Sequence, residues 1–206
     1  MLKVFYLEGI GLKTSKLEEE MSKSIELINK YVPKTEQEKE DIILMNEADK
    51  LFGDILTRDN KFCHLTSSVF VVNKERTKVL CVYHNIYKSW SWVGGHADGD
   101  DDLIYVAEKE LKEETSLNEF KFLSDVPITI DSLPVISHVR KGKFVPAHLH
   151  FNVTFLVEAD EKSAISIQEE ENSGVEWIEF EKFLDACTEP HMLPVYKKCI
   201  ERCKMI

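Results

Sequence analysis

The segment from Gly94 to Leu117, GGHADGDDDLIYVAEKELKEETSL, constrains the fold more than any other part of the chain. A glycine-rich turn follows a run of strand-forming residues, and a helix expected at about residues 102 to 115 carries Glu110, Glu113 and Glu114. At about 100° per residue, these glutamates fall on one arc of the helix that adjoins its apolar positions. The acids are therefore expected to lean toward the core of an α/β domain.

Two interpretations of this acidic arc follow from its spacing. Carboxylates crowded on a partly buried face repel one another and lose hydration, and a divalent cation such as Mg²⁺ or Mn²⁺ offsets that cost because it prefers hard oxygen ligands. Alternatively, a run of glutamates on a helix forms a solvated acidic face. Spacing alone leaves both interpretations open.

The same segment resembles the Nudix box, G-x5-E-x7-R-E-U-x-E-E-x-G-U, in which U is an aliphatic residue. The positions that match outright are Gly95, Glu110, Leu111, Glu113, Glu114 and Leu117. Asp101 stands where the family has Glu, Lys109 where it has Arg, and Ser116 where it has Gly. The resemblance implies a Nudix-type α/β/α sandwich with a mixed sheet. It also implies a hydrolase that uses Mg²⁺ or Mn²⁺ to cleave a diphosphate linkage in a small nucleotide-like molecule.

The resemblance also implies roles for individual residues. The expected metal ligands are the box carboxylates and one backbone carbonyl, namely Glu110, Glu113, Glu114 and the carbonyl of Gly94. Glu171, six residues before Trp177, resembles a loop glutamate of several Nudix enzymes and is a further expected ligand. Either Glu171 or Glu110 would take a proton from the attacking water, and Lys109 would brace the cluster.

The three altered box positions predict specific weaknesses. Lys109 offers one flexible ammonium in place of the planar fork with which Arg pairs bidentately to a carboxylate. Asp101 is shorter than Glu, which matters if it must reach the cluster or brace Lys109. Ser116 replaces a glycine just past the helix, where a positive φ strains any side chain. These changes predict a slower enzyme, with a catalytically weak, nucleotide-binding sensor module as the alternative.

Two histidines suggest where substrate binds. His148 and His150 share one side of an expected strand because alternate residues share a face, and Asn152 continues that row. Such a polar stripe either lines a pocket or belongs to a half-exposed edge strand. The pair alone does not predict a zinc site, because no third ligand is spaced to complete it.

Further candidate substrate contacts flank the box. Trp92, with Trp90 on the same expected face, either stacks on a planar base or packs in the core. His96 follows the glycines directly and either reaches a phosphate or is exposed in the turn. Arg58 is a candidate phosphate contact, as are Arg140 and Lys141.

The chain is expected to comprise an N-terminal helical extension, residues 1–60, and a Nudix domain, residues 61–206. Within the extension, helices are expected at 15 to 31 and from Thr35 to about Gly53, the second opening with a capping box between Thr35 and Glu38. Its apolar side is expected at Ile42, Ile43, Leu44 and Leu51. These helices either cover the core of their own chain or form the surface of a homodimer.

The rest of the domain is expected to alternate strands and helices. The runs LTSSVFVV and TKVLCVYH predict a hairpin around NKER. Further strands are expected at 133 to 139, 148 to 158 and 174 to 178, and a long helix at 180 to 204.

Charge and composition narrow the partners. A formal net charge of −11 disfavours nucleic acid polymers, which need a basic surface. The sequence shows neither a long apolar run nor a signal peptide, so a cytoplasmic protein without a membrane partner is expected. Its five cysteines form no C-x-x-C pair and are expected to be reduced. An alternative activity, isomerisation of a prenyl diphosphate, would need Cys81 or Cys63 in the pocket.

Overall fold

The computed structural model describes residues 21–140, 142–167 and 172–206. Its strands are β1 (Cys63–Val72), β2 (Lys78–His84), β3 (Ser89–Ser91), β4 (Val93–His96), β5 (Phe120–Phe122), β6 (Thr129–Val135), β7 (His138–Arg140), β8 (Lys143–Val145), β9 (His148–Ala159) and β10 (Asn172–Glu179). Its helices are α1 (Lys23–Lys30), α2 (Glu36–Phe52), α3 (Leu103–Thr115), α4 (Phe180–Ala186) and α5 (Leu193–Cys203).

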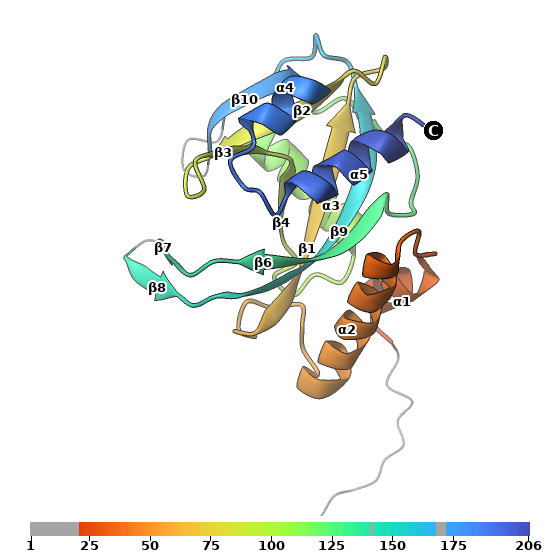
Figure 1. The fold of residues 1–206 in the computed structure, drawn as a ribbon, viewed down its shortest axis with the longest axis vertical. Helices are drawn as coiled ribbons and strands as arrows, with labels where there is room; N and C mark the ends of the chain where they lie inside the picture. Colours follow the sequence, from red (N-terminus) through yellow and green to blue (C-terminus); the bar gives the residue numbers. More distant parts are fainter. Residues whose placement is uncertain (1–20, 141, 168–171) are drawn as a thin grey trace, which may run out of the picture.

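A mixed sheet forms the centre of the molecule. Its main path runs β10-β2-β1-β9-β5, with β3 on β2, β4 on β1 and β6 on β9, while β7 and β8 form a separate hairpin. The central pair, β1 and β9, is parallel, and the other pairs are antiparallel. Helix α3 covers one face, and α4 and α5 cover the other (Figure 1). The expected α/β/α sandwich is confirmed.

Each face of the sheet packs its own hydrophobic core. On the first face, the apolar residues of α3 meet inward residues of the central strands, such as Leu65 and Val69. On the second face, Tyr196 and Cys199 of α5 pack against Phe70 and Leu156. All ten residues of β1 are buried, as expected for a central strand covered on both faces. Because alternate residues of β1 face opposite sides of the sheet, its position determines which of its side chains lie on each face.

The N-terminal helices cover the core of their own chain. Ile25, Ile28 and Met45 are at most 3% exposed and belong to the same hydrophobic cluster as the sheet. The expected apolar side of α2 is wrong in large part, because Leu51 is 76% exposed and Ile43 and Leu44 are also exposed. The buried residues of α2 are Glu38, Met45 and Ala48.

The ends of α2 follow the sequence signals, with one correction. Thr35 caps the helix by accepting from the Glu38 N–H at 3.2 Å, and Gly53 ends it with φ +68°. However, Glu38 does not complete the expected capping box. Its Oε2 accepts from the backbone N–H of Lys34 at 2.8 Å, because its carboxylate is turned inward to a charged partner.

That partner is Arg202 of α5, and the two form the centre of a buried polar network. Arg202 Nη1 donates to Glu38 Oε1 at 2.5 Å and Nη2 donates to Oε2 at 3.1 Å. Tyr31 also donates to Glu38 at 2.9 Å, and Lys198 Nζ lies 3.5 Å away. Burial alone would raise the pKa of Glu38, but hydrogen bonds from Arg202 and its other partners lower it to about 2. Helices at opposite ends of the chain are thereby joined.

Several expected elements differ from the structure. The expected helix at 180 to 204 is two helices, because Pro190 and Pro194 interrupt it and Pro194 lies in the first turn of α5. The strand expected at 133 to 139 is divided between β6 and β7. The hairpin is confirmed as β1 and β2, whose Cα register pairs Val72 with Val79. Within the described residues, no helix has both the length and the apolar character needed to cross a membrane.

Candidate active site

A cavity of about 1050 Å³ opens beside α3 and the adjoining ends of β1, β4 and β9. Its wall includes most of the candidate site residues that the structure describes: Arg58, Trp92, Gly94, His96, Lys109, Glu110, Glu113, Glu114, His148 and His150. The volume suits a nucleotide-sized ligand. Residues separated by more than eighty positions in sequence therefore share one space.

The three box glutamates reach this cavity because their arc overlaps and adjoins the buried side of α3. Asp102 caps the helix by accepting from the Tyr105 N–H at 3.1 Å. The buried side chains of the helix, among them Leu103, Ala107 and Leu111, set its rotation about its own axis. Glu114 is consequently buried at 8% exposure, Glu110 is half-buried and Glu113 is exposed. The predicted common arc is confirmed, and a purely solvated acidic face does not describe Glu114.

Gly95 makes room for Glu110 and Gly94 makes room for strand β1, and both lie in strand β4 and not in the expected turn. A Cβ on Gly95 would lie 2.3 Å from Cδ of Glu110 and 2.5 Å from both of its carboxylate oxygens. A Cβ on Gly94 would lie 2.7 Å from the backbone oxygen of Ser67. The carboxylate of Glu110 therefore rests directly against the β4 backbone, which tolerates no side chain at either position.

The altered box positions make local contacts. Lys109 Nζ lies 4.0 Å from Glu113 Oε2, and both side chains are about half exposed. Asp101 neither reaches the glutamates nor braces Lys109, because it pairs with Lys23 at 3.6 Å and accepts from that residue's N–H at 3.3 Å. Ser116 ends α3 with φ +56°, as expected for the position of the family's glycine.

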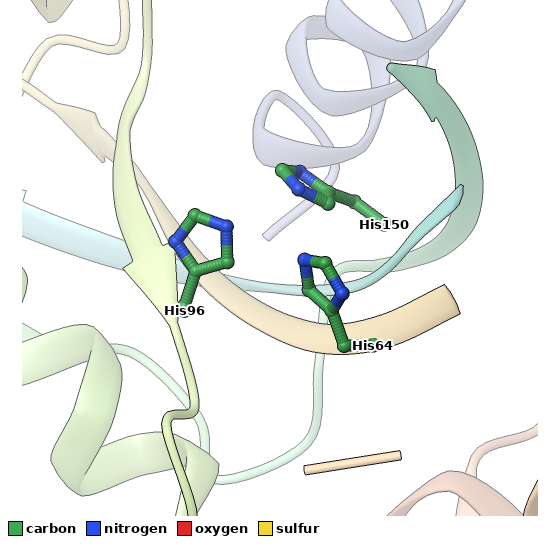
Figure 2. Close-up of side chains that lie close together, drawn as sticks. All are labelled: His64, His96 and His150. Carbon is green, nitrogen blue, oxygen red and sulfur yellow. The ribbon is translucent and has the colours of Figure 1, made fainter. Parts of the chain in front are cut away.

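Among the histidines of the cavity wall, four lie at the neighbouring ends of β1, β4 and β9: His64, His96, His148 and His150. Parallel pairing sets His150 directly opposite His64, and Thr66, on the same face as His64, is opposite His96. Figure 2 shows three of the rings turned toward one another. Burial lowers the pKa of His96 to about 3, and Arg58 adds to this effect. Burial and the neighbouring His96 lower the pKa of His150 to about 2, so both rings are neutral at physiological pH.

The structure adds two site residues that the sequence interpretation did not select, Thr66 and Ser68. Both donate hydrogen bonds at 2.8 Å to Oδ1 of Asn152, which the sequence places in the row of His148 and His150. These side chains continue the row of His64 and His150 along β1 and β9 and also line the cavity. A signal for them exists, because His64, Thr66 and Ser68 are polar residues at alternate positions of a strand that is apolar at most of its other positions.

The remaining candidate residues have mixed surroundings. Arg58 makes a bidentate pair with Asp98, at 2.7 and 2.5 Å, on the rim of the cavity. Trp92 packs edge-on against Tyr196, with ring centroids 5.1 Å apart, while also forming part of the wall. Arg140 lines the cavity too. The candidates Glu171 and Lys141 lie outside the described residues.

The cysteines give no support to an isomerase. All five are buried free thiols, and none of them lines the described cavity wall. Cys81, one of the two that this activity would need, is fully buried in the core on the α5 side of the sheet.

Comparison with known proteins agrees with this geometry. The family model described as NUDIX domain matches residues 64–199. That match covers most of the chain, including the sheet and the carboxylate helix. The chain belongs to the Nudix family, and it is accordingly a hydrolase of the acid-anhydride class.

Solved structures share the fold at low sequence identity. An Ap4A hydrolase from C. elegans in a binary complex has 16% identity and a TM-score of 0.53, covering 69% of this chain and 98% of that chain. A MutT protein from Methanosarcina mazei Go1 has 16% identity and a TM-score of 0.51, covering 70% and 98%. The E. coli dihydroneopterin triphosphate pyrophosphohydrolase has 14% identity and a TM-score of 0.50, covering 67% and 92%. No curated protein matches the chain in sequence.

Proposed function

We propose that this chain hydrolyses a diphosphate linkage in a small nucleoside-diphosphate-linked metabolite, with Mg²⁺ or Mn²⁺ as its cofactor. The observation that carries the proposal is the placement of Glu110, Glu113 and Glu114 along the wall of one nucleotide-sized cavity. Two of the similar folds belong to an Ap4A hydrolase and a dihydroneopterin triphosphate pyrophosphohydrolase, whose names describe phosphate-linked substrates. A substrate of that chemical class is consistent with the cavity.

The residues present fit a hard divalent cation. Three carboxylates converge on the cavity, and one of them, Glu114, is buried although the chain carries an excess of negative charge. Glu110, Glu113, Glu114 and the carbonyl of Gly94 would hold the ion, because oxygen ligands suit Mg²⁺ and Mn²⁺. The chemistry supplied there by a bound divalent cation is neutralisation of the diphosphate and acidification of a water molecule.

The chain's own groups then have distinct tasks. Glu110 is held against the β4 backbone and is one candidate to take the proton of the attacking water, with Glu171 as the other. Lys109 contributes positive charge beside Glu113. Neutral His96 and His150 offer N–H groups to substrate oxygens, and His148 lines the same wall beside them. Trp92 offers a ring edge at the wall, and Arg58 offers its remaining N–H groups at the rim.

Phosphate release from a substrate panel tests the proposal. The panel contains dinucleoside polyphosphates, nucleotide sugars and isoprenoid diphosphates, each assayed with Mg²⁺ and with Mn²⁺. Metal-dependent hydrolysis of at least one nucleoside-linked diphosphate is expected. Turnover of an isoprenoid diphosphate to its isomer, without hydrolysis, would overturn the proposed reaction.

One observation favours a second candidate function, a catalytically weak module that senses a nucleotide derivative. Lys109 and Asp101 are not paired with each other or with Glu110, and each contacts another residue. The box is thus less braced than a bidentate arginine would make it. Tight binding of a nucleotide without hydrolysis of any panel compound would favour the sensor.

Mg²⁺ or Mn²⁺ is expected to raise the melting temperature. Bringing three glutamates to one cavity is unfavourable until a cation neutralises them, and binding to the folded state alone stabilises that state. The gain is about 2.7 kcal/mol at a free metal concentration of about 100 times Kd. Differential scanning fluorimetry measures it, with K⁺ at equal ionic strength as the control. An unchanged melting temperature in millimolar Mg²⁺ and Mn²⁺ would contradict a preformed site.

Lys109→Arg is expected to increase kcat about fivefold, equivalent to about 1 kcal/mol of barrier. A guanidinium can donate two hydrogen bonds to Glu113, whereas the ammonium of Lys109 now lies 4.0 Å from it. The double variant with Asp101→Glu is measured beside it, although Asp101 contacts Lys23. Lys112→Arg is the control, because Lys112 pairs with Glu108 on the same helix. Equal rates for both arginine variants would show that bracing of Glu113 is not limiting.

A further inference from the structure

The second group of chemically reactive side chains in the cavity is the histidine cluster at the ends of β1, β4 and β9. One ring nitrogen from each of His64, His96 and His150 lies within 4.8 Å of the corresponding nitrogens of the other two. Their ring centroids are 4.8 to 5.1 Å apart. Figure 2 shows the three rings directed into a common space from three separate segments of the sheet.

The tautomer of His64 is determined by its surroundings. Its Nδ1 lies 3.1 Å from the backbone oxygen of Asn60, which can only accept, so Nδ1 carries the hydrogen. The lone pair is therefore on Nε2. That atom is buried and has no hydrogen-bond partner among the described residues. A buried imidazole fixed by a carbonyl on one side, with an unsatisfied lone pair on the other, is the arrangement seen in metal-ligating histidines.

A fourth histidine supports the ring of His150. His148 Nδ1 lies 2.9 Å from the backbone oxygen of Pro146, so it too carries its hydrogen on Nδ1. Its Nε2 therefore accepts from Nε2–H of His150 at 3.2 Å, which holds that ring in place and leaves the lone pair of His150 on Nδ1. The cluster is thus oriented by the backbone at residues 60 and 146, outside the strands themselves.

We propose that His64, His96 and His150 bind one divalent transition-metal ion, best matched by Zn²⁺, with a fourth position open to the cavity. Tetrahedral Zn²⁺ with Zn–N distances of about 2.1 Å requires nitrogen separations of about 3.4 Å. The present spacing, at most 4.8 Å, would have to close to that value when the ion binds. Water or an oxygen atom of a cavity ligand would complete the coordination.

This site is chemically distinct from the carboxylates of α3. Imidazole nitrogen suits Zn²⁺, Cu²⁺ and Ni²⁺, whereas Mg²⁺ prefers oxygen. The two sets nevertheless line one cavity, although Glu110 rests against Gly95 and the next residue, His96, faces the other side of β4. A metal ion bound by the histidines would therefore contact the same molecule in the cavity as a metal ion bound by the carboxylates. The proposal does not depend on the hydrolase activity.

The test is metal binding by the full chain after chelator treatment, with excess Mg²⁺ present to occupy the carboxylates. Co²⁺ is added first, because a tetrahedral nitrogen site gives visible absorption bands, and Zn²⁺ is then titrated against a chromogenic chelator. One Zn²⁺ per chain is expected. His64→Gln and His150→Gln should each weaken binding at least about tenfold.

Two controls separate the possible results. His191→Gln removes a histidine of the cavity wall outside the cluster and should leave Zn²⁺ affinity unchanged. Glu114→Gln should also preserve Zn²⁺ binding, whatever it does to Mg²⁺-dependent hydrolysis, so the two proposals fail independently.

If a histidine variant does not fold, zinc K-edge absorption of the loaded wild type counts the ligands, with three imidazoles expected. Zn²⁺ lost in Glu114→Gln but retained in the histidine variants, or fewer than three imidazole ligands, overturns the proposal.

Discussion

Glu114→Gln is expected to lower the rate of diphosphate hydrolysis at least about a hundredfold and to leave the fold intact. The amide keeps the shape of the side chain but lacks the charge needed to hold a divalent cation. Among the box glutamates, Glu114 is the buried one, at 8% exposure, so water cannot easily replace its contribution. Steady-state phosphate release with saturating Mg²⁺ measures the effect, and circular dichroism verifies the fold.

The matched control for this experiment is Glu108→Gln. Glu108 is on the same helix, but it pairs with Lys112 at 2.5 Å and does not line the cavity. Its loss should change the rate less than about twofold, since an exposed ion pair contributes little. Wild-type activity in a correctly folded Glu114→Gln variant would show that the metal assignment at this position is wrong.

Arg202→Met is expected to destabilise the fold by about 3–5 kcal/mol, because it leaves a buried carboxylate without its main partner. Glu38 is fully buried, and Arg202 contacts both of its oxygens. Chemical denaturation at neutral pH measures the change. Lys30→Met, which breaks the exposed Lys30–Glu26 pair, is the control and should cost less than about 1 kcal/mol.

The pH dependence provides an internal check on that result. The pKa of Glu38 is lowered from 4.5 to about 2 in the folded chain, so its stabilising effect is complete above pH 4.5 and is lost as pH falls toward 2. The difference between wild type and Arg202→Met should therefore narrow over that range. The double variant Glu38→Leu/Arg202→Met should recover much of the stability, because it removes both charges. A constant difference across the range would assign the destabilisation to lost packing.

The carboxylate helix could be predicted from sequence because its information is local. Helical periodicity alone places Glu110, Glu113 and Glu114 on one side, and the cap at Asp102 lies within the same segment. Ser116 was likewise expected at a positive φ, which the structure confirms. The apolar side of α2 was predicted wrongly because its burial depends on contacts that are distant in sequence. Glu38 is buried because its partners compensate its charge, and the main one, Arg202, stands 164 residues away in the sequence.

The histidine cluster could not be predicted from spacing either, because its members come from segments that are far apart in sequence. The sequence predicts no zinc site at His148 and His150, because no third ligand stands near them in sequence. The missing rings come from β1 and β4, which only sheet topology brings beside β9. Alternating polar residues at His64, Thr66 and Ser68 were the available signal. They identify a polar face of β1 but not the strand that pairs with it.

The parallel pairing of β1 with β9 also has a consequence for how the chain acquires its structure. Thr66 and Asn152 hydrogen-bond across 86 residues, so the central strands cannot join until that whole loop has closed. Contacts of such long range slow folding and expose unpaired strand edges in the meantime. During synthesis, β1 therefore emerges from the ribosome before β9 and stays without this partner strand until β9 has been synthesised. A chain truncated before residue 148 lacks β9 and, with it, the means to form either the central sheet or its cavity.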